Sequence, residues 1–501
     1  MRTSGILLHI TSLPSRWGVG TLGAEARAFV DRLHEAGQTF WQILPIGPTG
    51  YGDSPYQSFS TFAGNPYLID LDTLCDEHLL APAEYQTIDW GQDAEHVDFG
   101  LLYQHRFEVL DRACSRLLET ENEDFDTFCT ENADWLEDYA LFFALKTAHG
   151  GAPWYEWELG LRFRERQALE AARLEHAYQM SLCRAAQYLF FRQWAALKTY
   201  ANGLGVRIIG DLPIYVSADS ADVWANPGLF QLDASLRPTE VAGVPPDGFT
   251  DKGQLWGNPL FDWDAHAREG YSWWISRVRR QFDLLDVLRI DHFRGFDTYY
   301  AVPAGDADAK NGRWRQGPGM ELFRALHDAL GARPIIAEDL GYLTDSVRRL
   351  LLESGFPGMK LLQFAFDSRE DSDYLPHNYT KNCVVYAGTH DNDTINGWMQ
   401  TAPSEDAAFA RAYLRLTAEE GWNWGVMRAV WASAGDTAIV TMQDVLGLGS
   451  EARMNTPSTL GGNWTWRMRP GAFTEPLARR LYHDTALYRR LPPDASKEES
   501  K

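Results

Sequence analysis

The sequence has little positive charge for its length. Its 501 residues contain 46 lysines and arginines against 69 aspartates and glutamates, which gives a formal net charge of −23. Nucleic-acid binding draws much of its affinity from lysine and arginine contacts to phosphate, so this balance argues against a polyanionic partner. A neutral substrate fits the composition better.

Cysteine pairs and long apolar runs are also scarce. The cysteines are odd in number, far apart and in no Cys-x-x-Cys arrangement, as expected for reduced thiols in the cytoplasm. They are Cys75, Cys114, Cys129, Cys183 and Cys383. No run of 18 apolar residues occurs, and the apolar run at 6–8 is too short for the core of a secretion signal. We therefore expect a soluble, cytoplasmic protein without a membrane partner.

Eight short apolar runs end in polar residues, and several are separated by stretches with helical periodicity. The runs are 6–10, 40–45, 206–211, 287–291, 334–338, 359–364, 383–388 and 438–443. The helix-like stretches include 24–36, 184–202, 271–282, 320–330 and 345–354. Alternating strands and helices occur in doubly wound sheets and in barrels, but the count of eight favours an α/β fold of the (β/α)8 TIM barrel type.

We expect one catalytic barrel over residues 1–501, with large insertions between its strands. Residues 71–184, after the second strand, are rich in helix formers and aromatics and predict a mostly helical insertion. Residues 217–263, after the third strand, are rich in Gly, Pro, Asn and Asp and predict a long functional loop. Gly203, Gly331 and Gly355 follow three predicted helices, where a C-terminus favours glycine.

Acidic residues close four of the eight predicted strands. Active sites of such barrels form at the C-terminal ends of the strands, where this sequence places Asp211, Asp291, Glu338 and Asp391. A single aspartate at a strand end commonly caps the next turn or helix, so the convergence of four indicates a site. Paired carboxylates are typical of glycoside chemistry, in which one attacks the anomeric carbon and the other protonates the leaving oxygen.

Metal binding is a competing use of these carboxylates. The run 391–393 resembles a calcium loop, but it lacks the glycine and the distal glutamate of that motif. Arg289 lies two residues before Asp291 on the same strand face, where its charge would compete with a metal and keep the carboxylate ionised. A salt bridge without a catalytic role is the alternative for this pair. We expect no metal.

Residues 18–23 read Gly-Val-Gly-Thr-Leu-Gly and match the fingerprint of dinucleotide-binding folds. A seven-residue loop, 11–17, separates them from the preceding strand, and the second predicted strand supplies no acidic residue for a ribose. The sequence contains no Gly-x-Ser-x-Gly elbow, Walker loop or His-Glu-x-x-His motif. We expect no organic cofactor.

Long motifs recur along nearly the whole chain. They are LLH at 7–9, TSLP at 11–14, GYGDSPYQ at 50–57, GNPYLI at 64–69, GDLP at 210–213, GQLWGNP at 253–259, RIDHFRGF at 289–296, AEDLG at 337–341 and GTHDNDT at 388–394. In these motifs the chain resembles the amylomaltases of glycoside hydrolase family 77. The resemblance implies a 4-α-glucanotransferase, which moves α-1,4-glucan segments from a donor to the 4-hydroxyl of an acceptor glucan or glucose.

The resemblance also implies a role for each of three carboxylates. Asp291 would be the nucleophile, Glu338 the general acid and base, and Asp391 the carboxylate that holds sugar hydroxyls in the transition state. In such a retaining mechanism the first two carboxyl groups lie about 5 to 5.5 Å apart, close enough for direct attack.

Further positions are implied to bind substrate. Tyr56, Asp211 and Arg289 would surround the donor glucose. His292 and His390 would donate to substrate hydroxyls, although a histidine beside a catalytic aspartate can equally be a structural partner.

A loop over the cleft is carried here by residues 241–258, with Phe249 and Trp256 near the glucan and Tyr51 at a remote glucan contact. Core packing is the alternative for all three. The chain departs from the family pattern at Gly248, where a loop tyrosine is expected, and at Ser458, where a glycine is expected. Serine cannot enter positive φ as cheaply as glycine.

Two other functions stay open at this point. An α-1,4-glucan hydrolase on the same barrel would use the same carboxylates, and a catalytically silent glucan-binding protein would use the aromatics. The intact trio of carboxylates argues against the silent binder. We expect α-1,4-glucans and maltooligosaccharides as partners, glucose as an acceptor, no nucleic acid, and a monomer.

Overall fold

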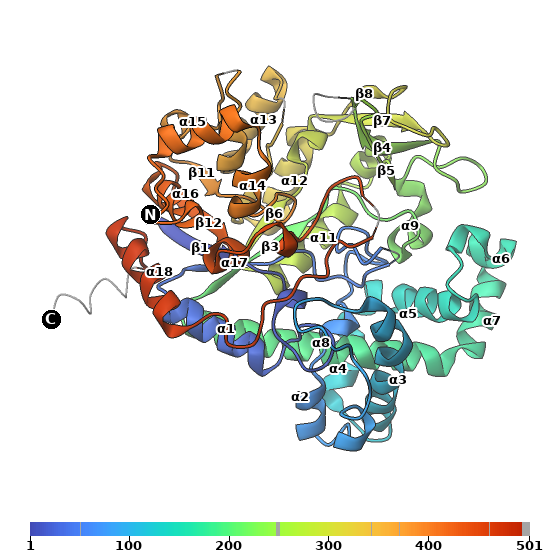
Figure 1. Ribbon diagram of the computed structural model, residues 1–501. Helices are drawn as coiled ribbons and strands as arrows, with labels where there is room; N and C mark the ends of the chain where they lie inside the picture. Colours follow the sequence, from blue (N-terminus) through green and yellow to red (C-terminus); the bar gives the residue numbers. More distant parts are fainter. Residues whose placement is uncertain (51, 247–250, 342, 370, 460, 493–501) are drawn as a thin grey trace.

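Eight parallel strands form the centre of the molecule (Figure 1). The computed structural model describes residues 1–50, 52–246, 251–341, 343–369, 371–459 and 461–492. The strands are β1 (Thr3–Leu7), β2 (Phe40–Gln42), β3 (Arg207–Leu212), β6 (Val287–Ile290), β9 (Ile335–Ala337), β10 (Gly358–Leu361), β11 (Cys383–Tyr386) and β12 (Thr437–Thr441). Their order in the sheet is β10-β11-β12-β1-β2-β3-β6-β9. Each overlaps one predicted strand, so the (β/α)8 barrel is confirmed.

The barrel closes between the two end strands, β9 and β10. No strand ladder joins them in the described residues. The Ala337 N–H donates to the Pro357 carbonyl at 3.0 Å, and the Met359 N–H donates to Asp339 Oδ1 at 2.6 Å. One backbone bond and one carboxylate therefore fasten this seam.

Alternate residues of the strands point into the barrel and out to the helices, as the period of a strand dictates. A compact inner cluster fills the barrel; its members are Leu7, Phe40, Ile209, Val287, Ile336, Met359, Leu361, Val384, Tyr386 and Ile439. Between β1 and β2, a Cβ on Gly5 would lie 2.6 Å from the Phe40 Cβ. Glycine is needed there because a larger residue would push the strands apart.

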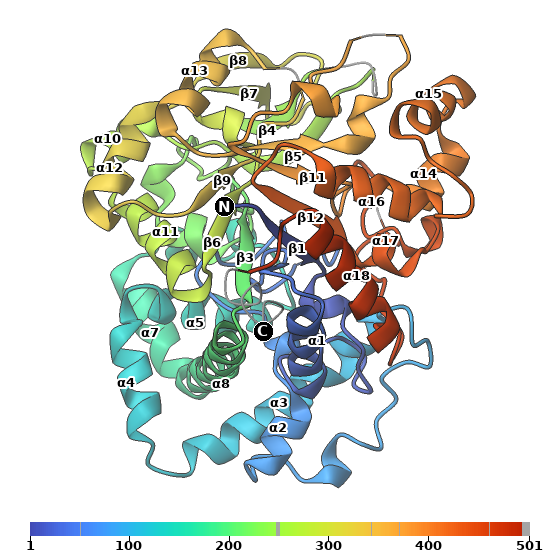
Figure 2. The same cartoon turned by 90° about the vertical axis from the view of Figure 1, so that its left-hand side faces the viewer.

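Helices cover the outside of the barrel (Figure 2). They are α1 (Ala24–Glu35), α8 (Ala177–Gly203), α10 (Trp263–Arg268), α11 (Ser272–Leu284), α12 (Met320–Leu330), α13 (Asp345–Ser354), α14 (Ile395–Thr401), α15 (Ser404–Leu414), α16 (Trp422–Ala432), α17 (Met442–Leu446) and α18 (Glu475–Leu487). Gly331 and Gly355 follow their helices with φ of 73° and 71°, as predicted. The prediction for Gly203 is wrong, because α8 includes it and Gly205 takes the positive φ of 77°. No helix in these described ranges is long and apolar enough to cross a bilayer.

A layer of helices lies below the barrel and to its right in Figure 1. It contains α2 (Leu71–Asp76), α3 (Phe99–Leu118), α4 (Glu123–Glu131), α5 (Ala133–Ala148), α6 (Leu159–Arg162) and α7 (Arg166–Glu175). The 27-residue α8 begins inside the range 71–184 and continues beyond it. The layer and the barrel therefore share one long helix.

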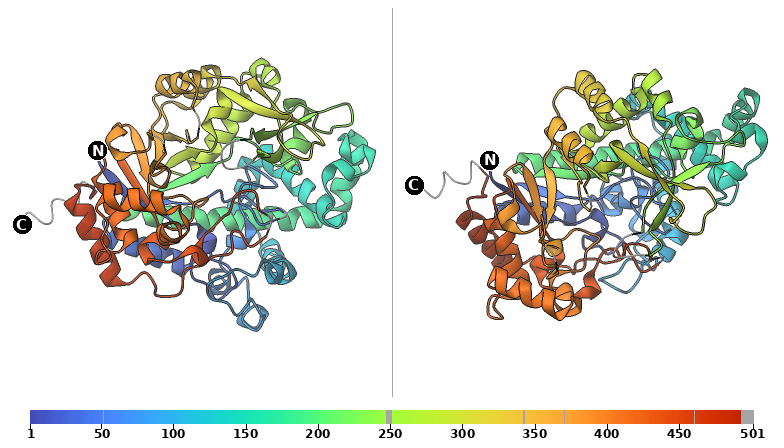
Figure 3. Two further views of the ribbon diagram at one scale, coloured as in Figure 1. Left: turned by 45° about the horizontal axis from the view of Figure 1, so that its top comes forward. Right: turned by 90° about the horizontal axis from the view of Figure 1, so that it is seen from above.

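The segment 217–263 is not the loop that its composition predicts. It contains α9 (Ala221–Ala225), β4 (Glu240–Val244) and β5 (Gln254–Pro259), and the strands join β7 (Thr298–Pro303) and β8 (Arg313–Gln316) in an antiparallel sheet of order β5-β4-β7-β8 (Figure 3). Val241 pairs with Val302, far along the chain. Because a distant partner supplies the ladder, local composition misses these strands.

Candidate active site

The four strand-end carboxylates gather at the C-terminal rim of the barrel. Asp211 lies in β3, Asp291 and Glu338 follow β6 and β9 directly, and Asp391 follows β11 after a short loop. In the sheet register Asp211 is opposite Arg289, and Ile290 is opposite Ala337. Three neighbouring strands therefore bring Asp211, Asp291 and Glu338 together.

One guanidinium nitrogen joins two of these carboxylates. Arg289 Nη1 donates to both oxygens of Asp211, at 2.7 and 2.6 Å, and to Asp291 Oδ1 at 3.0 Å. The Tyr56 hydroxyl donates to Asp211 Oδ2 at 2.8 Å. Burial opposes the charge of Arg289, but Asp211 and Asp291 outweigh it and raise its pKa well above the ordinary value. A permanent buried cation thus orients the Asp291 carboxylate.

Asp291 and Glu338 have different surroundings. Burial raises the pKa of Asp291 to about 6, against the opposing pull of Arg289. Burial, with the charge of Asp291, raises the pKa of Glu338 to about 7. The Asp291 side chain still exposes 31% of its surface, so a substrate can reach it from the solvent side. Two carboxyls with separated pKa values suit one ionised and one protonated group.

Backbone N–H groups fix Glu338. The N–H of His292 donates to Oε2 at 2.7 Å, and the N–H of Leu340 donates to Oε1 at 2.9 Å. His292 adopts φ 52°, a left-handed conformation that is rare outside glycine and common at functional sites. Burial lowers the pKa of His292 to about 3. Its ring is therefore neutral, and it meets Trp256 edge to face at 4.8 Å.

Asp391 is held by residues from the C-terminal part of the chain. Asn455 Nδ2 donates to its Oδ1 at 2.6 Å, and Arg453 Nη2 donates to its backbone carbonyl at 2.7 Å. His390 Nε2 lies 3.4 Å from the same Oδ1, and the His390 ring stacks on Tyr56 at 5.1 Å. Sequence reasoning missed Arg453 and Asn455, although Asn455 lies three residues before Ser458, where the chain departs from the family pattern.

The aromatic predictions fall in different places. Trp256 lies on β5, where its indole N–H donates to Gln254 Oε1 at 3.0 Å and its ring reaches the rim through His292. Phe249 and Tyr51 lie outside the described residues, as does Gly248. The structure therefore brings Trp256 to the rim and leaves the other two as predictions.

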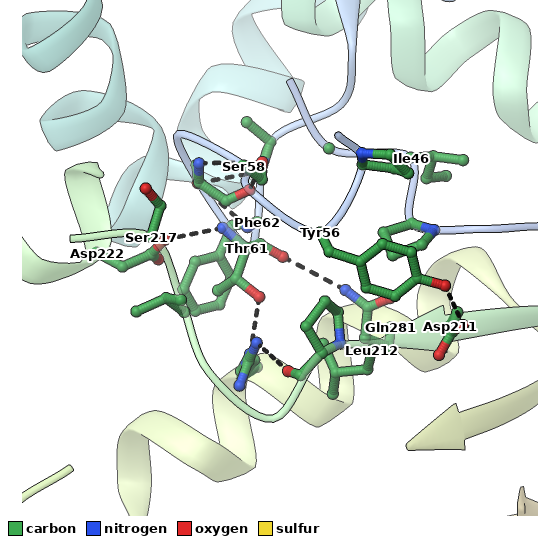
Figure 4. A pocket seen from close by; sticks show the side chains of 18 of the residues that line it. Ile46, Tyr56, Ser58, Thr61, Phe62, Asp211, Leu212, Ser217, Asp222 and Gln281 are labelled. Atoms are coloured by element: carbon green, nitrogen blue, oxygen red, sulfur yellow. Dashed lines mark hydrogen bonds between the residues drawn. The ribbon is translucent and has the colours of Figure 1, made fainter. Parts of the chain in front are cut away.

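A small cavity lies beside this rim (Figure 4). Its lining includes Tyr56, Asp211 and Asp222 but none of the other three strand-end carboxylates. Arg277 Nε and Gln281 Nε2 both donate to Thr61, at 2.7 and 3.3 Å, and tie its walls together. Its volume of about 40 Å³ suits a few water molecules and is too small for a sugar ring, since a water needs ~10–15 Å³ of such space.

The structure also bears on metal binding by the carboxylates and on dinucleotide binding by the glycine-rich run. In the described ranges no group of three or more His, Cys, Asp or Glu residues is arranged to hold a metal ion, and Arg289 fills the space between Asp211 and Asp291. In the glycine-rich run at 18–23, the carboxyl of Asp70 lies against Gly23, directly before α1. An anion at this helix start would meet a carboxylate of the same chain, so dinucleotide binding does not fit.

Comparisons with known proteins agree on one family. A family model described as 4-alpha-glucanotransferase matches residues 8–474. The chain is 50% identical over 491 residues to the 4-alpha-glucanotransferase of Thermus thermophilus, with 96% of this chain and 97% of that protein covered. It is 47% identical over 485 residues to that of Clostridium butyricum, with 96% and 100% covered.

A solved structure gives the same result. The fold matches an amylomaltase from Streptococcus agalactiae in complex with acarbose at a TM-score of 0.96 and 45% identity, with 98% of this chain and 100% of that chain covered. The family model, the sequence relatives and the solved structure all extend over nearly the whole chain. This chain belongs to the 4-alpha-glucanotransferase family, the amylomaltases of glycoside hydrolase family 77.

Proposed function

We propose that this enzyme transfers α-1,4-glucan segments by double displacement, with Asp291 as the nucleophile and Glu338 as the general acid and base. One arrangement carries the proposal: Asp291 accepts a hydrogen bond from the Arg289 guanidinium, and burial raises the pKa of the neighbouring Glu338 to about 7. Near neutral pH this pair supplies an ionised attacker beside a protonated donor.

In the first step, an Asp291 oxygen attacks the anomeric carbon as the Glu338 proton passes to the departing glucan oxygen. In the second, Glu338 removes the proton from the 4-hydroxyl of an acceptor, which displaces Asp291. Two inversions at the same carbon retain its configuration. A distance of about 5 to 5.5 Å between the two carboxyl groups is what this mechanism requires.

The remaining rim residues would bind the sugar. We assign Asp391 to sugar hydroxyls in the transition state, because it keeps 46% of its side chain exposed while Asn455 holds one oxygen. Tyr56, Asp211 and Arg289 would surround the donor glucose, with His292 and His390 as neighbours. Phe249 and Tyr51 stay predictions of the family resemblance.

Transfer exceeds hydrolysis when an acceptor sugar, rather than water, meets the intermediate. Trp256 supplies an apolar face at the rim beside His292, which supports exclusion of water there. We propose maltooligosaccharides as donors, maltooligosaccharides or glucose as acceptors, and a monomeric enzyme. All five cysteines are free thiols, which supports the cytoplasm as its compartment.

The test is to incubate the protein with maltotriose, beside an Asp291→Asn control, and to separate the products over time. A ladder of longer maltooligosaccharides together with glucose, absent from the control, is expected. Shortening to glucose and maltose alone would identify a hydrolase. No change in the sugar would identify a silent binder.

A further inference from the structure

A groove with no assigned role lies outside the active site. Its volume is about 530 Å³, and its lining includes Asn396, Gln400, Trp422, Asn423, Gly447 and Glu451. The residues come from α14, the start of α16 and the segment after α17, which lie side by side in Figures 1 and 2. None of these residues belongs to the rim or to the cavity of Figure 4. The volume is within the range of ~300–1,000 Å³ typical of small-molecule sites.

An aromatic ring lines this groove. Trp422 is the first residue of α16 and is only half-buried. Many tryptophans of this chain pack in ring clusters, but Trp422 contacts no other ring among the residues that the structure describes. A large flat apolar face with an indole N–H at its edge suits a ligand that is apolar on one side and polar at its rim. A glucose ring has this shape.

Side-chain amides provide the polar part of the groove. Gln400 is exposed, and its amide bonds to no other group in the described ranges. Asn396 Nδ2 donates to the Gly447 carbonyl at 2.9 Å, which leaves its own carbonyl oxygen to accept. Asn423 is only 7% exposed and is fixed by a bond from its Nδ2 to the Asp444 carbonyl at 2.7 Å. Amides both donate and accept, as the hydroxyls of a sugar require.

Charge argues for a neutral ligand. Glu451 is the one formally charged residue in the described lining, and its Oε1 already accepts from the Gly449 N–H at 2.9 Å. An anionic ligand would meet no cation there, and a cation would meet one exposed carboxylate. Gly421, Gly447 and Gly449 also line the groove and let a ligand approach the backbone closely.

Residues that neighbour the groove in sequence also contact the catalytic rim. Ser450, beside Glu451, donates from Oγ to Asp393 Oδ2 at 2.7 Å, and Arg453 donates to the carbonyl of Asp391. Asp391 and Asp393 stand just before α14, whose residues Asn396 and Gln400 line the groove. A chain bound in the groove would therefore lie next to the segment that carries Asp391.

We propose that this groove is an additional glucan-binding site, which holds one part of a long α-1,4-glucan while another part of the same glucan reacts at the rim. The inference rests on the proposed function for its choice of ligand. Binding at two sites would raise the effective concentration of the glucan at the rim. Long donors, which can occupy the groove and the rim at once, would gain most from it, and maltotriose would gain least.

The test compares Trp422→Ala and Gln400→Ala with Tyr178→Ala. Tyr178 is a 56% exposed aromatic on α8, in the helical layer away from the groove, and it serves as the matched control. We expect the two groove variants to raise KM for amylose about fivefold, about 1 kcal/mol at 1.4 kcal/mol per tenfold. Their kcat, and their KM for maltotriose, should match the control. Gln400→Ala covers the case in which Trp422→Ala disturbs α16, since Gln400 is exposed.

Direct binding separates this inference from the proposed function. Migration of each variant in an amylopectin gel is measured on the Asp291→Asn background, where no turnover occurs. Groove variants that are retarded less than the control support the site. Equal retardation and an equal KM for amylose, in folded groove variants, overturn it. A wild-type protein that fails to disproportionate maltotriose but loses retardation on groove substitution would instead overturn the proposed function alone.

Discussion

Replacement of Asn455 by alanine tests how the third carboxylate is positioned. The side chain makes the 2.6 Å bond to Asp391, while the backbone is held separately by the N–H to His390 and by the carbonyl, which accepts from Arg453. The substitution therefore removes one hydrogen bond to a carboxylate. Such a bond contributes about 1.5 to 3 kcal/mol. Asp391 is 46% exposed, so water replaces part of the contact, and we take the lower value.

A loss of about 1.5 kcal/mol in the transition state lowers kcat about tenfold. Because we assign Asp391 to transition-state contacts, kcat on maltotriose should fall while KM changes little. The assay is initial release of glucose over a range of maltotriose concentrations. Asn463→Ala is the matched control, because Asn463 binds Thr456 and Thr459 in the same segment. An Asn455→Ala enzyme with wild-type kcat, or an equal loss in Asn463→Ala, would refute the reasoning.

Three further predictions follow from the same geometry. The value of kcat/KM should rise as Asp291 ionises near pH 6 and fall as Glu338 loses its proton near pH 7, and a flat profile across this range contradicts the assignment. Folding raises the pKa of Asp291 from 3.8 to about 6. The folded state therefore loses stability as pH rises from about 4 to above 6, because Asp291 must ionise in a buried place. Asp291→Asn should therefore melt higher than wild type at neutral pH and equally below about pH 4; partial exposure reduces the full ~3 kcal/mol to about 1 kcal/mol. Ser458 has φ 63°, so Ser458→Gly should raise the free energy of unfolding by about 0.5–1 kcal/mol and with it the melting temperature. A variant that melts below the wild type would show that the strain is absent.

Much of the fold could be read from the sequence, because short apolar runs with polar ends are a local signal. Each of the eight strands shows this signal, and the aspartates and the glutamate of the site belong to the polar ends. The antiparallel sheet of β4, β5, β7 and β8 could not be read, because its strands are stabilised by partners distant in sequence.

The same limit applies to the site. Asp211, Asp291 and Glu338 were predictable because neighbouring parallel strands must end at one rim. Asn455 and Arg453 were not, since they reach Asp391 only when the end of the chain folds back over the barrel. Nothing in their local pattern indicates that return.

A ring of strands fastened at one place by a carboxylate has a preferred point of failure. Asp339 accepts a hydrogen bond from the Met359 N–H across the seam. Burial raises the pKa of its carboxyl, so acid would protonate Asp339 and weaken this hydrogen bond. The residue before it is Glu338. A small opening of this seam, without unwinding of any helix, would move Glu338 away from Asp291. The enzyme should then lose activity while its helical content is unchanged.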